Sequence, residues 1–338
     1  MNTAELFLKR EKEVLSPFAF LTADTKGRQA PAEPCPYRTE FQRDRDRIIH
    51  SKSFRRLMHK TQVFFAPVDE QFRTRMTHTL EVTQIARSIA RALRLNEDLT
   101  EAIAMGHDLG HTPFGHAGEE AMRICYDPDF SHYKQSLRVV DFLEKNGKGL
   151  NLTYEVRDGI VNHTGANMAS TLEGVVVKYA DRIAYVNHDL DDAFFAGILS
   201  KNDIPEPLAH FFAREYSYRV DIMVNSVIKE SLDQPKIAMT PEIGEAMAEM
   251  RRFLFDHVYK NSPAKHEEKK AVELLCRLYE YYVAHPYELP AFYRDHLETE
   301  GTERMVCDYI SGMTDQYAIA TYRTLFIPEV WKGGKSHD

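Results

Sequence analysis

The sequence predicts an all-α fold with one small β-hairpin. Apolar residues recur at helical spacing along almost the whole chain, and only one short stretch, near residue 60, alternates as a strand does. There is no internal repeat, and no apolar run approaches the roughly 18 residues that a membrane-spanning helix needs. At 338 residues with 43% hydrophobic content, the chain is long enough to bury a sizeable core. We find no convincing domain boundary and expect residues 1–338 to form a single domain.

The clearest helix begins near residue 77, where the positions of one face follow at steps of four, three, four and four. These positions are His78, Val82, Ile85, Ile89 and Leu93. The next helix, opened by Asn96 or Asp98, runs toward Gly106. A long helix containing "EGVVVKYADRIAYVNHDLDDAFFAG" ends at Gly197. Further helices are expected near 205–232, 241–260, 264–284 and 302–324, and the hairpin pairs "KTQVFF" with "QFRTRM".

Charge and cysteine content narrow the function classes. A net charge of -8 and a pI near 6.0 argue against a protein that coats nucleic acid or anionic membrane with its whole surface. Residues 38–75 are an exception, with ten Lys or Arg against five Asp or Glu. The alternating charges of this segment mainly indicate a solvent-exposed helix face. Arg55 and Arg56 precede the expected hairpin, however, and could bind a triphosphate. The four cysteines form no CxxC pair and follow no secretory leader, so we expect a cytoplasmic protein.

The segment "HDLGHTPFGH", residues 107–116, contains three histidines and one aspartate, all of which can bind a metal ion. It also contains Gly110, Pro113 and Gly115, residue types that end helices. A divalent ion that activates water needs several N or O ligands from different elements. His107 and Asp108 lie where one helix stops, His78 lies on the apolar face of its helix, and Asp181 lies on the long helix. Taken alone, His78 also fits a buried core histidine, and Asp181 also fits a salt-bridged helix carboxylate.

Spaced as H…HD…D along a helical chain, these four residues resemble the HD-domain metal phosphohydrolases. Longer blocks resemble the deoxynucleoside triphosphate triphosphohydrolases, the bacterial dGTPase family, and run in family order from about residue 54 to 318. These blocks are "KTQVF", "RTRMTHTLEV", "HDLGHTPFGHAGE", "QSLRVV", "ADRIAYVNHDLDDA", "RRFLFDHVY" and "DYISGMTDQYA". The resemblance implies an HD-domain helical bundle with its core at about 54–197 and a helical C-terminal extension at about 198–330.

The resemblance also implies an activity, the hydrolysis of a dNTP to deoxynucleoside and tripolyphosphate by attack of water at the α-phosphorus. Metal ligation carries over to His78, His107, Asp108 and Asp181, with Mn²⁺ or Mg²⁺ expected and Fe, Co, Ni or Zn also compatible with this ligand set. By the same match, His116 supports protonation of the leaving group, Glu119 supports His116, and His111 lines the phosphate pocket. On residues alone, the two histidines also fit a loop that uses them only for local hydrogen bonds.

Five substrate-binding residues follow from the same match. Tyr185 would stack under the deoxyribose, Asp189 and Gln62 would bind the 3'-hydroxyl, and His132 would lie near the phosphates. Arg75, one helical turn before His78, could pair with a phosphate oxygen as a planar fork. Without the resemblance, Arg75 fits a solvated surface arginine equally well, and Tyr185 fits a core aromatic.

The resemblance extends to partners. Other members assemble into oligomers, often hexamers, and some bind effector dNTPs or single-stranded DNA, so we expect a homo-oligomer and leave an effector and nucleic acid open. Two other function classes remain. One is an HD phosphohydrolase acting on nucleoside monophosphates, cyclic nucleotides or (p)ppGpp, and the other is a non-catalytic nucleotide sensor. Base preference lies in pocket shape and cannot be read from the sequence.

Overall fold

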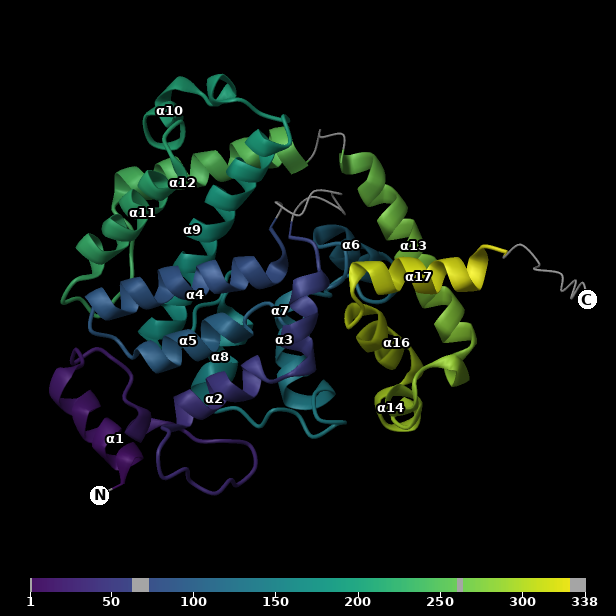
Figure 1. Cartoon of the computed structure of the whole chain (residues 1–338), viewed down its shortest axis with the longest axis horizontal. Coiled ribbons are helices and arrows are strands. Elements are labelled where there is room, and N and C mark those ends of the chain that lie inside the picture. Colours follow the sequence, from purple (N-terminus) through teal and green to yellow (C-terminus); the bar gives the residue numbers. More distant parts are fainter. Residues whose placement is uncertain (1, 63–72, 260–263, 329–338) are drawn as a thin grey trace, which may run out of the picture.

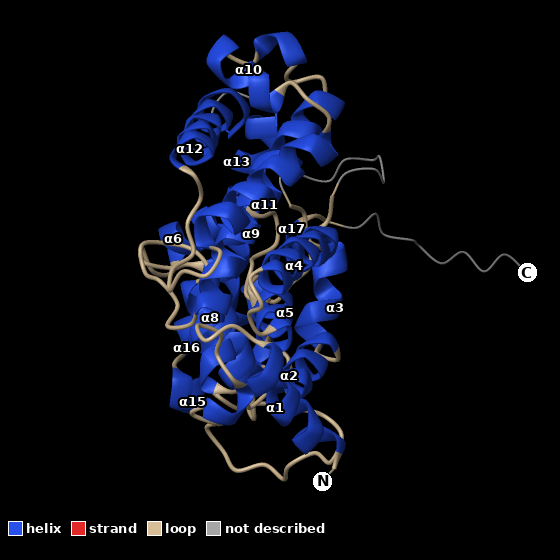
Figure 2. Cartoon of the chain, turned by 90° about the vertical axis from the view of Figure 1, so that its left-hand side faces the viewer, coloured by secondary structure: helices blue, strands red, loops and turns tan. Residues whose placement is uncertain are grey.

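The predicted all-α fold is confirmed. The computed structural model describes residues 2–62, 73–259 and 264–328, and these residues form seventeen α-helices (Figure 1). No strand is drawn within the described residues (Figure 2). In the region of the expected hairpin, the described residues form one antiparallel bridge, between Thr61 and Thr74. The turn of the expected hairpin lies outside the described residues.

The helices have the following bounds: α1 Thr3–Val14, α2 Glu40–Ile49, α3 Lys52–Arg56, α4 Arg75–Ala92, α5 Glu97–Gly106, α6 His116–Cys125, α7 His132–Arg138, α8 Tyr154–Asn162, α9 Leu172–Phe195, α10 Glu206–Phe212, α11 Tyr216–Ser231, α12 Pro241–Leu254, α13 Ala264–Ala284, α14 Ala291–Arg294, α15 Leu297–Glu300, α16 Thr302–Ser311 and α17 Asp315–Phe326.

Side-chain caps fix where the helices around the site begin. The Thr74 side chain accepts a hydrogen bond from the Thr77 N–H, so α4 starts two residues earlier than the periodicity predicts. Asn96 rather than Asp98 caps α5, because its side chain accepts from the Leu99 N–H. These caps satisfy backbone donors that the first turn of a helix leaves without intrahelical partners.

Two helical stretches expected to be continuous are each divided into two helices. Residues 205–232 form α10 and α11, and the buried Arg219 side chain donates a hydrogen bond to the Arg214 carbonyl in the break between them. Residues 302–324 divide after α16, where Gly312 ends the helix and the Thr314 side chain caps α17. The periodicity missed both breaks because the apolar spacing continues across them.

A first hydrophobic core lies between α4, α5, α8 and α9, with α2 against α5 and with α11 and α12 against α9. Ile85 and Ile89 of α4, Ile103 of α5 and Ile183 of α9 are almost completely buried in it. Since α4 carries His78, α9 carries Asp181 and α5 leads directly into His107 and Asp108, this core fixes the relative positions of the candidate metal ligands.

A second core joins α6 to the C-terminal helices α13, α16 and α17. Met122 of α6, Leu275 of α13 and Ile310 of α16 are completely buried in it. In Figure 1 the C-terminal helices gather beside α6, on one side of the α4–α9 bundle. Because α6 directly follows the "HDLGHTPFG" segment, the C-terminal helices support the candidate site.

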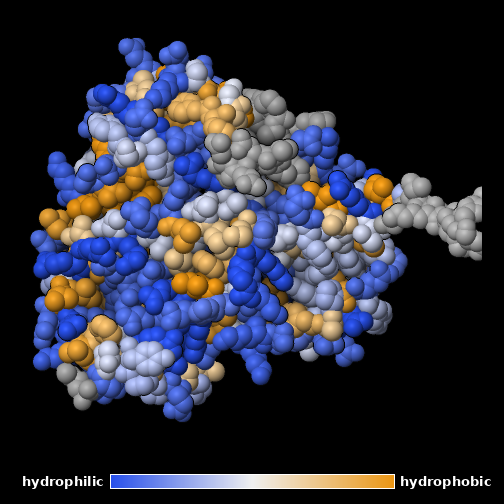
Figure 3. All heavy atoms as spheres, in the orientation of Figure 1, coloured by the Kyte–Doolittle hydropathy of each residue, from blue (hydrophilic) through white to orange (hydrophobic). Residues whose placement is uncertain are grey.

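The surface is mainly hydrophilic on the face shown in Figure 3, where hydrophobic residues form separate patches. Within the described ranges, no helix has the length and apolar character that crossing a membrane requires.

Glu173, at the start of α9, provides a prediction about stability. Its side chain is buried, and its Oε1 accepts hydrogen bonds from the backbone N–H groups of Phe20 (2.9 Å) and Asn96 (3.0 Å). Burial outweighs these bonds and raises the pKa of Glu173 to about 7. The unfolded chain has an ordinary carboxyl pKa near 4.3, so the stabilising effect of the protonated form is complete below that value. This stabilising effect is lost as the pH rises to about 7, and the free energy of unfolding then falls by roughly 3 kcal/mol.

We expect Glu173→Gln to remove this loss, because the glutamine oxygen can still accept both backbone bonds and carries no charge. The free energy of unfolding, measured by denaturant titration between pH 5 and pH 8, should fall less for the variant than for the wild type. Glu242→Gln, at an exposed position of α12, is the control and should follow the wild type. Parallel curves for wild type and Glu173→Gln would contradict the prediction.

Candidate metal centre and active site

The four candidate metal ligands converge in the structure. His78 Nε2 lies 3.2 Å from Asp181 Oδ1, and His107 Nε2 lies 3.7 Å from Asp108 Oδ2 and 3.9 Å from Asp181 Oδ1. His78, His107 and Asp108 are buried, and 15% of the Asp181 side chain is exposed. Ligand-capable atoms of His78, His107 and Asp108 all lie within 4.8 Å of one another, and Asp181 approaches both histidines, so α4, the turn after α5 and α9 together supply two imidazoles and two carboxylates.

The hydrogen bonds of His107 show which of its nitrogens is available. His107 Nδ1 lies 2.7 Å from the Ala104 carbonyl, an acceptor, so Nδ1 carries the proton. In the neutral ring the lone pair is then on Nε2. This atom is buried and has no hydrogen-bond partner among the described residues. A buried acceptor aimed at two carboxylates is explained if a cation binds between them, and the donor set suits a first-row divalent metal.

A second histidine lies behind His78 and was missed by sequence reasoning. His188 of α9 is buried, and burial lowers the pKa of His188 to about 4 although it contacts Glu81, so the ring is neutral. Its Nε2 faces the Glu81 carboxylate and therefore holds the single proton. Its Nδ1, 3.3 Å from His78 Nδ1, is then an acceptor for the His78 proton. This chain leaves the lone pair of His78 on Nε2, which faces Asp181.

We predict that His188→Ala lowers the affinity for Mn²⁺ by about 10- to 100-fold, as is common when a residue that orients a metal ligand is lost. Isothermal titration calorimetry on chelator-treated protein measures this. Tyr216→Phe is the matched control, because it removes a hydroxyl that lies 3.0 Å from His188 Nε2 and 3.5 Å from Glu81 Oε2 but keeps both His188 and the Glu81 carboxylate. Equal affinities for His188→Ala and the wild type would show that His188 does not orient His78.

Both candidate carboxylate ligands are ionised in this environment. Burial raises the pKa of Asp181, but where His78 Nε2 and His107 carry protons in place of a cation, the hydrogen bond from His78 and the charge of His107 outweigh the effect of burial and lower the pKa of Asp181 to about 2. For Asp108, burial is outweighed by the charges of His107 and Arg75, and the pKa lies well below its usual value. Arg75 supplies one positive charge beside these two carboxylates, and a divalent cation would supply the rest.

The loop after the ligands turns back through two residues of left-handed conformation, Phe114 (φ 61°) and Gly115 (φ 58°). A Cβ at Gly115 would lie 3.2 Å from the Gln62 carbonyl, so glycine permits both the backbone angle and the close approach. Helix α6 then begins at His116. The helix-breaking residues of the motif thus have a structural role, because the turn that they form places His116 in the first turn of a new helix.

The candidate catalytic residues are adjacent to one another. The His116 side chain is 74% exposed, and its Nδ1 lies 3.7 Å from Oε2 of the buried Glu119. Glu119 also accepts hydrogen bonds from the backbone N–H of His132 (3.0 Å) and the side chain of Arg123 (2.9 Å). His111 is buried and stacks on His132, with ring centroids 4.7 Å apart. Ligand-capable atoms of His111, His116 and Glu119 all lie within 4.8 Å of one another.

Arg75 is buried rather than solvated. Its Nη1 donates a hydrogen bond to Asp108 Oδ2 at 2.6 Å, and its other nitrogens donate to the carbonyls of Thr61 (3.1 Å) and Gln62 (3.3 Å). A solvated surface role is therefore wrong for Arg75. Its positive charge lies directly beside a candidate metal ligand, where a phosphate would also approach.

Two of the other residues expected to bind substrate, Tyr185 and Asp189, lie on the same face of α9 as Asp181. The third, Gln62, lies beside Arg75. Tyr185 is half-buried, with the Arg251 guanidinium of α12 5.6 Å from its ring centroid, and sequence reasoning missed Arg251. Asp189 is buried, and burial raises its pKa well above the usual value. Gln62 is buried, and its Oε1 has no hydrogen-bond partner within the part of the chain that the structure describes.

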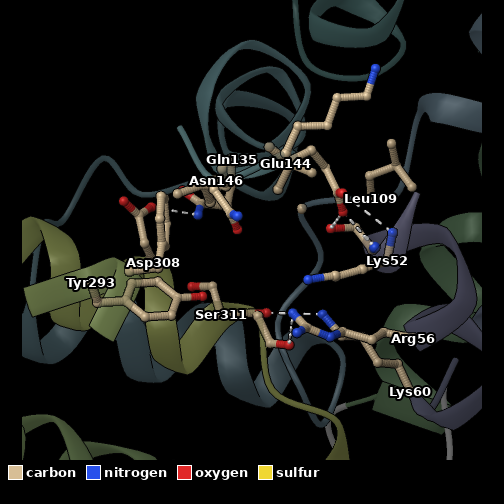
Figure 4. Close-up of a pocket in the computed structure, with 17 residues that line it drawn as sticks. Lys52, Arg56, Lys60, Leu109, Gln135, Glu144, Asn146, Tyr293, Asp308 and Ser311 are labelled. Atoms are coloured by element: carbon tan, nitrogen blue, oxygen red, sulfur yellow. Dashed lines mark hydrogen bonds between the residues drawn. The ribbon is translucent and has the colours of Figure 1, made fainter. Parts of the chain in front are cut away.

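A cavity of about 140 Å³ lies behind the loop, on the side of Gly110 and the C-terminal helices (Figure 4). In it, the buried Lys60 side chain contacts the His111 carbonyl and donates a hydrogen bond to the Ser311 carbonyl at 2.9 Å. On α17, Asp315 accepts a hydrogen bond from the Phe114 N–H at 2.9 Å. Asp315, 201 positions from Phe114, therefore holds the loop directly, and Lys60 connects the loop to Ser311 of α16.

Comparisons with known proteins agree with this geometry. Residues 75–186 match the HD domain family, and residues 237–324 match the phosphohydrolase-associated domain. A phosphohydrolase structure from Bacteroides thetaiotaomicron has the same fold, with a TM-score of 0.54 at 17% identity over 83% of this chain and 68% of that chain. The fold and the site thus define an HD-domain protein of the phosphohydrolase class.

Curated relatives specify the family. A deoxyguanosinetriphosphate triphosphohydrolase-like protein from Caldanaerobacter subterraneus is 51% identical, covering 98% of both chains. Proteins with the same name from Desulfatibacillum aliphaticivorans (46% identical, 97% of this chain and 99% of the relative) and Clostridium tetani (45%, 95% of both) are also similar. The chain belongs to the deoxyguanosinetriphosphate triphosphohydrolase-like family.

Proposed function

We propose that this protein hydrolyses deoxynucleoside triphosphates to deoxynucleoside and tripolyphosphate in a metal-dependent reaction. The observation that carries the proposal is the convergence of His78, His107, Asp108 and Asp181, with an available His107 Nε2, beside the His116–Glu119 pair. The names of its relatives, which share the whole length of the chain, support a purine dNTP as one substrate.

The arrangement accounts for each part of the reaction. His78, His107, Asp108 and Asp181 would hold a divalent cation, which lowers the pKa of bound water and polarises a phosphoryl oxygen. The water would lose a proton to solvent and its oxygen would form a bond to the α-phosphorus while the bond from phosphorus to the 5'-oxygen breaks. His116, exposed at the start of α6 and backed by Glu119, would donate the proton that the 5'-oxygen needs to leave.

Substrate binding would use residues around this centre. The Arg75 guanidinium beside Asp108, together with His111 and His132, would contact phosphate oxygens. Tyr185 would lie against the deoxyribose, and Asp189 and Gln62 would bind its 3'-hydroxyl. We propose Mn²⁺ or Mg²⁺ as the metal and a homo-oligomer as the assembly, while a dNTP effector and a nucleic-acid ligand are separate questions.

Chromatographic product analysis tests the proposal. Purified protein is incubated with each of the four dNTPs, with GTP, with dAMP and with cyclic AMP, in Mn²⁺ and then in EDTA. We expect tripolyphosphate and deoxynucleoside from at least one dNTP, only with metal and not from GTP. If every single dNTP stays intact, mixtures of dNTPs test for a required activator.

Two outcomes would favour other functions. Phosphate release from dAMP or cyclic AMP, without dNTP hydrolysis, would indicate a different HD phosphohydrolase. Absence of metal-dependent turnover with every nucleotide and mixture would indicate a non-catalytic nucleotide sensor.

A further inference from the structure

The cavity of about 140 Å³ behind the loop is lined by cationic side chains that lack an anionic partner. There are four of them, Lys52, Arg56, Lys60 and Lys145. Within the part of the chain that the structure describes, none of the four forms an ion pair with a carboxylate. The candidate metal ligands are not among the described residues that line the cavity, so it is separate from the metal centre.

Lys60 is a buried cation of this cavity, with 3% of the residue exposed. Its Nζ contacts the His111 carbonyl and donates a hydrogen bond to the Ser311 carbonyl at 2.9 Å. An ammonium group has three N–H donors, so one remains for a ligand. Burial and the charge of Arg56 lower the pKa of Lys60 to about 7. A buried ammonium without an anion costs free energy, and an anion in the cavity would offset that cost.

Arg56 is a second donor to the same cavity. Figure 4 shows Lys52, Arg56 and Lys60 on one side of the cavity, with Tyr293 across from them. The Arg56 side chain is half-buried, and its Nη1 donates a hydrogen bond to the Gly312 carbonyl at 3.0 Å. A guanidinium has five N–H donors in a planar fork that matches a phosphate, so Arg56 keeps donors for a ligand.

The two acidic residues that line the cavity are held by other groups. Glu144 Oε1 accepts hydrogen bonds from the backbone N–H and the hydroxyl of Ser53, both at 2.7 Å. Asp308 pairs with Arg138 at 2.7 Å and with Arg304 at 2.6 Å. Neither carboxylate is therefore paired with the cations of the cavity, and an excess of positive charge remains there.

The volume of the cavity limits the size of its ligand. Pockets that enclose a drug-sized ligand have volumes of about 300–1,000 Å³, so a cavity of about 140 Å³ is too small to enclose a whole nucleotide. A cavity needs only roughly 10–15 Å³ to hold one water molecule, so an ion of five to nine heavy atoms fits.

We propose that this cavity binds a small inorganic oxyanion of the phosphate class, orthophosphate or pyrophosphate, through Arg56, Lys60 and Lys52. Charge-assisted hydrogen bonds from Lys and Arg are the usual recognition of such an anion. The inference concerns a cavity outside the metal centre, so it does not depend on a dNTP being the substrate.

A bound oxyanion would join two parts of the molecule. Lys60 contacts the loop at the His111 carbonyl, and Arg56 contacts the C-terminal region at the Gly312 carbonyl. An anion held by both side chains would fix the loop against the C-terminal helices. This consequence separates the proposed role of Arg56 from the binding of a substrate triphosphate.

Isothermal titration calorimetry on chelator-treated protein in EDTA tests the proposal, with pyrophosphate as the probe. We expect Arg56→Gln to weaken binding by at least about 10-fold, because a charge-assisted hydrogen bond is lost. Arg55→Gln is the matched control and should keep the affinity of the wild type, because Arg55 is the next residue of α3, is exposed and does not line this cavity. Any pyrophosphate bound beside Arg75 should persist in both variants.

Lys52→Gln tests the same cavity at an exposed position, where a folding defect is not expected. We expect it to weaken pyrophosphate binding by about 2- to 5-fold, in keeping with the loss of one exposed charge. Thermal unfolding checks that each variant folds. If Arg56→Gln does not fold, Lys52→Gln decides the outcome.

Three results would overturn the proposal. The first is that the wild type binds neither orthophosphate nor pyrophosphate. The second is that every folded cavity variant binds pyrophosphate as tightly as the wild type, which would place the anion elsewhere. In a parallel titration with dGTP in EDTA, the third is a loss of dGTP affinity in Arg56→Gln as large as the loss of pyrophosphate affinity, which would identify a nucleotide phosphate as the ligand instead of a free anion.

Discussion

Replacing His107 by alanine should remove bound metal and nucleotide hydrolysis together. The variant loses the one candidate ligand whose Nε2 is buried, lacks a hydrogen-bond partner among the described residues and faces both carboxylates. It also removes the imidazole that lies between Asp108 and Asp181, 3.7 Å from one carboxylate and 3.9 Å from the other. We expect Mn²⁺ affinity to fall by more than about 100-fold, the upper end of losses for residues that only orient a ligand.

Calorimetry and product analysis measure the two effects of His107→Ala on the same preparation. Thermal unfolding in EDTA is the control for folding, since the variant also leaves a small cavity at the end of α5. Loss of hydrolysis with unchanged Mn²⁺ affinity would contradict the assignment of His107 as a ligand. Unchanged hydrolysis would contradict the proposed centre as a whole.

The helices of the first core could be predicted from the sequence because burial on one face imposes a period. On α4, His78, Val82, Ile85 and Ile89 are all buried, as their spacing predicts. The breaks at residues 213–215 and 312–314 were not predicted, because they depend on Arg219 and on a cap at Thr314 rather than on apolar spacing. Local hydrogen bonds decide such breaks, and periodicity does not report them.

The candidate site was predictable only where residues form a motif. The motif and its resemblance gave His107, Asp108, His116 and Glu119, which the structure places close to one another or to the centre. His188 gave no such signal, because it is a single histidine in a helical context. Its role depends on the packing of α9 against α4, which places its Nδ1 3.3 Å from His78 Nδ1.

Arg75 illustrates a further limit of spacing arguments. Its position one turn before His78 predicts proximity to the candidate metal ligands, and the structure places its Nη1 2.6 Å from Asp108 Oδ2. The spacing does not reveal that the segment from Thr61 to Gln62 lies against the start of α4 and that its two carbonyls accept hydrogen bonds from Arg75. Contacts between segments far apart in sequence decide whether such a side chain is buried or solvated.

His116→Ala should separate chemistry from metal binding. His116 is exposed at the start of α6 and lies in a different cluster from His78, His107 and Asp108, so its removal should leave Mn²⁺ affinity near that of the wild type. If His116 donates the proton to the leaving 5'-oxygen, kcat should fall by about 10²- to 10⁴-fold, the usual contribution of a general acid. Steady-state kinetics on the most reactive dNTP measures this, with calorimetry on the same protein.

Glu119→Gln provides the matched comparison for His116→Ala. Glutamine keeps an oxygen that can accept the His132 backbone N–H, but it removes the charge that His116 and Arg123 both face. If Glu119 acts through His116, the double variant should be no slower than His116→Ala, because a residue that orients a missing acid has nothing left to orient. Additive losses in the double variant would show that Glu119 acts independently of His116, and loss of metal from His116→Ala would assign His116 to the metal centre instead of to proton transfer.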